Sequence, residues 1–217
     1  MKKIHLALII VLAFAACKKS DIPGDNVCIS QVKMQNFNVK SSDSVAAITL
    51  LKQNAIPYSD LQLSFVGFDT VKSGPNTGIY QYVFAVQYIN GLPVLSTHIW
   101  YQFKNNILQS TTGTNYSSVS LFGGSALSLP QLRELYLNAT IKNNSVVSFK
   151  DSCLVAQFGY YDLSALSGGA PNFVKAWSVT PRNYEAYPQV FFRDDNGATI
   201  LYNGGPVPVS DDALHLK

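Results

Sequence analysis

The stretch Ile79-Tyr80-Gln81-Tyr82-Val83-Phe84-Ala85-Val86-Gln87-Tyr88-Ile89-Asn90-Gly91 is the part of this 217-residue chain that best indicates its fold. Successive side chains of a strand point to opposite faces, so Tyr80, Tyr82 and Phe84 share one face with Val86 and Tyr88. The intervening positions carry Ile, Gln, Val, Ala and Gln. Asn90-Gly91 suits a type I′ turn, in which both central residues need a positive φ. The stretch therefore predicts a long strand that ends in a tight hairpin.

Strand-like and helix-like runs flank this hairpin on both sides. Residues 92–103 predict the returning strand, and Asn105-Asn106 a second tight turn before a strand at 107–111. Upstream, Leu61, Leu63 and Phe65 alternate as in a strand. Before them an apolar stripe predicts a helix that starts at Ser42 or Asp43 and ends before Pro57, with the members Val45, Ile48, Leu51 and Ala55. This region therefore predicts a helix followed by an antiparallel meander.

The same order recurs in the second half of the chain. Ser128, Pro130 and Gln131 predict a capped helix start, and Leu132, Leu135 and Tyr136 continue its apolar side. Strands are predicted at 146–149, 153–161, 173–180, 189–193 and 198–202, with a hairpin turn at 195–197. We therefore expect an α+β fold of two tandem modules, 41–116 and 126–205, each a helix packed on an antiparallel sheet, followed by a tail at 206–217.

Two segments carry a family resemblance. Residues 173–181, 187–192 and 194–202 resemble the closing part of a PepSY domain. Residues 82–113 resemble the related propeptide module of thermolysin-type and fungalysin-type proteases. The resemblance implies a PepSY/cystatin-like fold without catalytic residues of its own, in a class of modules that inhibit proteases or assist their folding. No His-Glu-x-x-His protease segment occurs in this sequence.

The N-terminus reads as a targeting segment. Lys2 and Lys3 precede an apolar run that is too short to span a bilayer, which predicts a signal peptide at 1–16. Residues 14–17, Phe-Ala-Ala-Cys, resemble a bacterial lipobox, which implies lipidation of Cys17 and anchoring in the membrane. The alternative is an ordinary cleaved signal with a coincidental cysteine. Residues 17–40 are expected to be the lipidated cysteine and its tether, and Lys18 after the cysteine favours the outer membrane.

Charge and cysteine content narrow the partners of the mature chain. Removing Lys2 and Lys3 lowers the basic residues from 16 to 14, against 13 acidic ones, so the net charge falls to +1. No basic patch with interleaved aromatics occurs, which argues against nucleic acid. Cys28 and Cys153 remain as a pair that can form a disulfide in an oxidising compartment; the alternative is two buried thiols. Their wide spacing argues against a metal site.

The sequence offers little catalytic chemistry. His98 lies in a predicted strand and His215 in the tail, and no Gly-x-Ser-x-Gly motif is present. The run 194–197 lacks the alternating oxygen ligands of a calcium loop. We therefore expect no catalytic residue, no metal and no cofactor.

Aromatic side chains are the remaining candidates for function. Tyr80, Tyr82, Trp100 and Trp177 are predicted to form a binding surface; the alternative is that such aromatics fill the core between the two modules. We expect a non-catalytic envelope lipoprotein that binds a polypeptide, for example as an inhibitor or chaperone of an envelope protease. The alternatives are a glycan-binding surface lipoprotein, suggested by the Tyr, Trp, Asn and Gln content, and an uncharacterised hydrolase.

Overall fold

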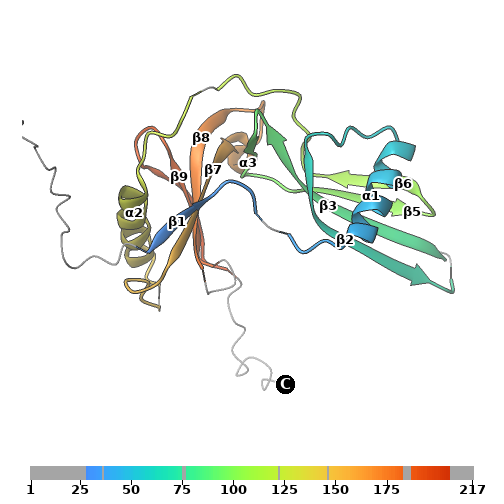
Figure 1. Ribbon diagram of the computed structural model, residues 1–217, viewed down its shortest axis with the longest axis horizontal. Helices are drawn as coiled ribbons and strands as arrows, with labels where there is room; N and C mark the ends of the chain where they lie inside the picture. The colour runs from blue at the N-terminus through green and yellow to red at the C-terminus, as the bar shows by residue number, and fades with distance from the viewer. Residues whose placement is uncertain are drawn as a thin grey trace, which may run out of the picture.

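A computed structural model describes residues 28–205, apart from positions 36, 75–76, 122, 146 and 183–186. The fold is α+β, with two five-stranded sheets that are mostly antiparallel and few helices (Figure 1). Four strands of the first sheet follow the order β2-β3-β5-β6, with β4 paired beside β3, and the second sheet has the order β1-β7-β8-β9-β10. The predicted signal peptide, the first part of the tether (17–27, with Cys17) and the tail 206–217 lie outside the described residues.

The first half is a helix followed by an antiparallel meander, as predicted. Its elements are α1 (Ser41–Gln53), β2 (Leu61–Val71), β3 (Gly78–Ile89), β4 (Leu92–Pro93), β5 (Ile99–Lys104) and β6 (Ile107–Thr112). Both predicted tight turns are confirmed, because φ is +52° at Asn90, +76° at Gly91, +50° at Asn105 and +66° at Asn106. The returning strand was predicted as one piece, but it is divided into β4 and β5.

The helix α1 forms where it was predicted, and the predicted stripe member Leu51 is buried, but the buried stripe is otherwise displaced from the predicted one. Val45 is 65% exposed, and Ala55 lies beyond the helix end with a φ of +56°. The buried positions are Ala47, Leu50 and Leu51, which pack against β3 and β5. The core of this half consists of Ala47, Leu50, Leu51, Val83, Ile99, Tyr101 and Phe103. The N-cap residue is Lys40, so the helix also begins slightly before the predicted Ser42 or Asp43.

The second half repeats the order of a helix and four antiparallel strands. Its elements are α2 (Leu129–Lys142), β7 (Leu154–Asp162), the short α3 (Ser164–Ser167), β8 (Phe173–Pro181), β9 (Gln189–Arg193) and β10 (Thr199–Asn203). The predicted helix start is confirmed: the Gln131 side-chain oxygen accepts a hydrogen bond from the Ser128 N–H at 2.9 Å. Leu132 and Tyr136 are fully buried against the sheet. The strand predicted at 146–149 is wrong, because residues 147–149 are not in a strand.

An additional strand comes from the region predicted to be a tether. Strand β1 (Ile29–Val32) runs parallel to β7, with Ile29 opposite Leu154 and Val32 opposite Gln157. The Leu154 N–H also donates to the Cys28 carbonyl oxygen at 2.7 Å. The expectation that the tether continues to residue 40 is therefore wrong for this segment. Parallel pairing with a strand more than 120 positions away leaves no local signal in the sequence.

The two halves meet through the chain that follows β4. Val94 forms a parallel bridge with Tyr160, and the Leu95 N–H donates to the Tyr160 carbonyl oxygen at 2.7 Å. Gly159 is required at this point, because a Cβ there would collide with the Pro93 carbonyl oxygen. The buried residues at the junction are Ile89, Val94, Val119 and Tyr160. Among the described residues, no helix combines the length and apolarity needed to cross a bilayer.

Candidate functional site

Three of the four predicted binding aromatics lie together on the first sheet, on the face opposite α1. The strand register places Phe84 opposite Phe65 of β2 on one side and opposite Trp100 of β5 on the other. Tyr80 and Tyr82 precede Phe84 at alternate positions of β3 and share its face, while the intervening Val83 packs under α1. We call this set the aromatic face: Phe65, Tyr80, Tyr82, Phe84 and Trp100.

Four of the five rings of the aromatic face, those other than Tyr80, contact one another in a continuous row. Phe84 and Trp100 are stacked, with ring centroids 5.3 Å apart and an interplanar angle of 10°. Phe65 meets Phe84 edge-on at 5.5 Å, and Tyr82 lies 6.2 Å from Trp100. At the far end, the Lys104 ammonium lies 5.5 Å from the centre of the Tyr80 ring. Such pairs stabilise one another beyond simple area burial, so the row is held in place.

The aromatic face is open to solvent. Phe65 is 54% exposed and Trp100 is 36% exposed, while the other three members are partly buried. The ring of Phe65 lies over Gly67, where a Cβ would come within 2.7 Å of it. An aromatic ring over a strand glycine covers backbone that has no side chain of its own. Large apolar groups that remain exposed in a contiguous patch are typical of an interaction surface.

The second half covers only one end of this sheet face. Val86, further along β3, is buried, and Tyr88 reaches the junction beside Gln157 and Ser178. The alternative prediction, that aromatics fill a core between the modules, therefore holds for this end and fails for the aromatic face. His98 borders the same junction, at a cavity of about 30 Å³. That space accommodates about one water molecule.

A free sheet edge runs beside the aromatic face. Strand β2 is eleven residues long and lies at the end of the first sheet, so its outer edge pairs with no other described strand. Near the start of β2, Gln62 Nε2 donates to the Gln35 carbonyl oxygen at 2.7 Å. An unpaired edge presents a row of backbone N–H and C=O groups that can pair with another chain.

Trp177, the fourth predicted member, is not at this surface. It is 1% exposed in the core under α2, and its indole Nε1 donates to Asp194 Oδ1 at 2.9 Å. The same carboxylate accepts hydrogen bonds from the N–H groups of Ala126 and Leu127 and lies 3.8 Å from the Lys175 ammonium. Trp177 is therefore part of a buried network that fixes the linker to the second sheet.

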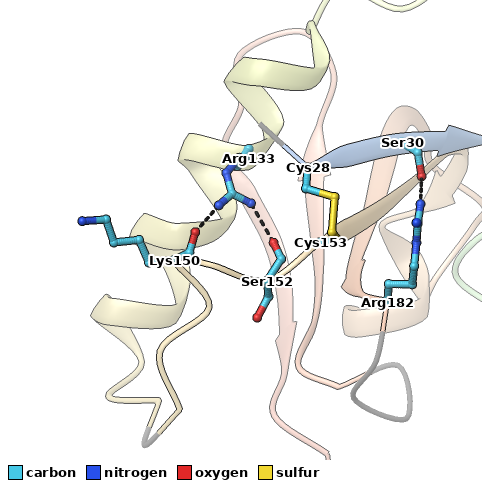
Figure 2. The surroundings of a disulfide bond; sticks show 7 residues. All are labelled: Cys28, Ser30, Arg133, Lys150, Ser152, Cys153 and Arg182. Atoms are coloured by element: carbon cyan, nitrogen blue, oxygen red, sulfur yellow. Dashed lines mark hydrogen bonds between the residues drawn. A yellow bond between two sulfur atoms is a disulfide. The ribbon is translucent and has the colours of Figure 1, made fainter. Parts of the chain in front are cut away.

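The other predicted pair, Cys28 and Cys153, is joined by a disulfide in the structure (Figure 2). The bond connects the start of β1 to the residue before β7, with the two Cα atoms 4.5 Å apart. Arg182 adds a second link to the arm by donating to the Ser30 hydroxyl at 2.7 Å (Figure 2). This arrangement attaches the N-terminal arm to the second half of the molecule, although the first half follows it in sequence.

The histidine and carboxylate side chains show no arrangement for metal chemistry. In the described part of the chain, no three His, Cys, Asp or Glu side chains come together to hold a metal ion. His98 lies just before β5 rather than inside a strand, and burial lowers its pKa. His215 lies outside the described residues.

Sequence reasoning omitted two members of the aromatic face from the candidate site. Phe84 could have been included, because it shares the alternation of Tyr80 and Tyr82. Phe65 could not, because its position depends on a register shift between Leu63 and Phe65 in β2. No family model matches this chain, and no curated protein matches it.

Proposed function

We propose that this protein is a non-catalytic binding protein for an extended polypeptide in the bacterial cell envelope. The observation that carries the proposal is the exposed aromatic face beside the free edge of β2. An extended peptide that pairs with β2 would gain main-chain hydrogen bonds along an eleven-residue strand. Its side chains on one side would then lie next to Phe65 and Phe84.

The ring geometry favours a polypeptide over a glycan. A sugar ring stacks on an aromatic ring whose flat face is open to solvent. Phe84 has one flat face against Trp100, at a 10° interplanar angle, and it meets the Phe65 ring edge-on. Side chains of a peptide, by contrast, can insert between and over ring edges. Inhibiting or chaperoning an envelope protease is one task that this mode of binding would serve.

Three features support placement in the envelope. The Cys28–Cys153 disulfide is typical of an oxidising compartment outside the cytosol. The predicted signal peptide and the lipobox-like Phe-Ala-Ala-Cys at 14–17 fit export followed by acylation of Cys17. Acyl chains on this residue would hold the protein at the outer membrane. Incorporation of labelled palmitate into the wild-type chain, but not into Cys17→Ser, tests this part.

We further propose that the two halves are tandem copies of a PepSY-like module. The support is the shared order of elements: a helix and then four antiparallel strands that pair in sequence order. The halves differ by β1, which extends only the second sheet, and by β4, which follows only β3. A solved structure in which α1 with its meander fails to superpose on α2 with its meander would contradict the duplication.

The function is tested with a soluble chain that starts at residue 17 and carries Cys17→Ser. The probe is a reduced and alkylated protein, which offers extended polypeptide, and the competing probe is an insoluble polysaccharide. Phe65→Ser with Trp100→Ala removes the two most exposed members of the aromatic face. The matched control is Val45→Ser on α1, which is also exposed, at 65%, but lies on the other side of the sheet.

We expect the unmodified chain and Val45→Ser to retain the unfolded protein, and the double variant to lose at least ten-fold in affinity. All three should remain folded at the temperature of the assay, although the double variant should melt somewhat lower because it loses the two ring contacts with Phe84. Retention on the polysaccharide that depends on Trp100 would favour the glycan alternative. Equal binding of the probe by the double variant and the control would refute the proposal.

A further inference from the structure

A second exposed apolar region lies at the opposite end of the molecule from the aromatic face. The side of α2 turned away from the sheet forms a groove of about 500 Å³ together with the loop that follows it. Ile141 is 75% exposed there, and Val147 in the loop is 43% exposed. The groove is lined by Glu134, Leu137, Asn138, Ile141, Phe149 and Lys150, among others. A contiguous apolar region of this kind, unlike a single exposed aliphatic side chain, is typical of an interaction surface.

The N-terminal arm is attached at this same end. Figure 1 shows β1, which directly follows Cys28, beside α2, with the first sheet at the far side of the molecule. Cys28 is bonded to Cys153, and Arg133 of α2 donates to the carbonyl oxygens of Lys150 and Ser152 (Figure 2). The disulfide, α2 and the groove loop are therefore one connected unit.

We infer that this unit, the α2 end of the second half, rests on the lipid bilayer that holds Cys17. The inference rests on the proposed acylation of Cys17. Only eleven residue steps separate Cys17 from Cys28. They span about 40 Å when fully extended. A flexible chain of this length has a root-mean-square span of about 18 Å. The α2 end is thus confined near the bilayer surface, whereas the first half is not.

Apolar contact rather than charge would form this surface. The groove lining contains one acidic residue, Glu134, and one basic residue, Lys150, so their charges balance. Exposed Ile141 and Val147 are suited to the boundary between head groups and acyl chains. The contact can be weak and still form, because the tether gives it a high effective concentration. In this orientation the first half, which carries the aromatic face, lies at the other end of the molecule from the membrane (Figure 1).

The experiment uses the acylated full-length protein in vesicles of phosphatidylethanolamine and phosphatidylglycerol. Ile141→Cys is labelled with an environment-sensitive fluorophore, and Val45→Cys, which is also well exposed but lies on α1, is the matched control. Quenching by a spin label on the lipid acyl chains reports contact with the bilayer. We expect at least two-fold stronger quenching at position 141 than at position 45, unchanged in 1 M salt.

A second measurement needs no label. In the acylated wild-type protein on vesicles, hydrogen exchange at residues 137–150 should be slower than in the non-acylated chain in solution. Exchange at residues 41–53 should be the same in both. Protein that floats with vesicles but shows equal quenching at both positions, and no added protection at 137–150, would overturn the inference while leaving acylation intact. Protein that fails to float would overturn both. Binding to unfolded protein is measured separately on the soluble chain, so its failure is distinguishable from either.

Discussion

Removing the disulfide is the perturbation whose effect can be worked out most directly from the structure. The bond joins residues 125 positions apart, so it closes a loop that contains the whole first half and α2. In the chain-entropy model, a loop of this length lowers the entropy of the unfolded chain by about 16 cal/mol/K, which is about 5 kcal/mol at 25 °C. Cys28→Ser with Cys153→Ser should therefore lower the free energy of unfolding by about 4 to 5 kcal/mol.

Urea unfolding of the soluble chain measures this loss. The two tryptophans lie in different halves, since Trp100 is on β5 and Trp177 is in the core under α2. Trp100→Phe and Trp177→Phe therefore give two single-tryptophan backgrounds that report the second and the first half separately. Cys17→Ser alone is the control, because that thiol lies outside the loop and its loss should leave stability unchanged.

The disulfide also has a local effect on β1, separate from its effect on the entropy of the unfolded chain. Strand β1 has only four residues and pairs with β7 along one side, with Ile29 packed against the core. Because these contacts are few, the disulfide and the Arg182 contact with Ser30 should contribute much of what keeps the strand in place. Hydrogen exchange in β1 should rise at least ten-fold in the double serine variant, while β8 keeps its protection. A loss below about 1 kcal/mol together with unchanged exchange in β1 would refute the reasoning.

Three further predictions concern buried contacts. Asp194→Ala leaves the buried indole N–H of Trp177 and the N–H groups of Ala126 and Leu127 without their acceptor, and should lower the free energy of unfolding in urea by about 2 kcal/mol or more. Gly159→Ala places a Cβ against a backbone carbonyl oxygen of the first half and should lower the free energy of unfolding by about 2 kcal/mol. Gly124 has open space around it, so Gly124→Ala should change this free energy by under about 0.5 kcal/mol. Equal costs of the two substitutions would contradict the close approach at Gly159. Burial alone would raise the pKa of Asp162, but hydrogen bonds, including one from Tyr116, outweigh it and hold this pKa below 3.8. The ionised carboxylate therefore stabilises the fold at neutral pH, and this contribution is lost as the pH falls below about 4 through the folded-state pKa. Tyr116→Phe should raise the Asp162 pKa measured by NMR and flatten the decline of stability in acid; an unchanged pKa would contradict this coupling.

Features encoded by neighbouring residues could be predicted from the sequence. The turns at Asn90-Gly91 and Asn105-Asn106 depend on residues that tolerate positive φ, and the start of α2 depends on Ser128 and Gln131. The alternation along β3 correctly separated the helix-facing side chains from the others. In each case the determining residues lie within a few positions of one another.

Features encoded by distant pairing were missed or misplaced. Strand β1 is stabilised by a parallel partner and a disulfide, neither of which marks its own four residues. The stripe of α1 was misplaced because Val45 and Ile48 fit helical spacing as well as Ala47 and Leu50 do. The sequence did not distinguish the exposed Trp100 from the buried Trp177. Each lies in a strand, and whether its face of the sheet is covered depends on how distant elements pack.

The path of the chain explains why a binding surface can be carried on the first half. The N-terminal segment, which carries the proposed lipidation site Cys17, is bonded to the second half at Cys28–Cys153 before the chain enters α1. If the protein is held at Cys17 and a partner pulls on the first half, the force takes two paths. One passes through the disulfide into β7, and the other follows the chain into the first half. The first half contacts the second through the end of β3, through β4 and through the residues that follow it, and the aromatic face takes no part in that junction. The proposed binding at the aromatic face and the proposed attachment at the N-terminus would therefore use separate contacts, so loss of one should leave the other intact.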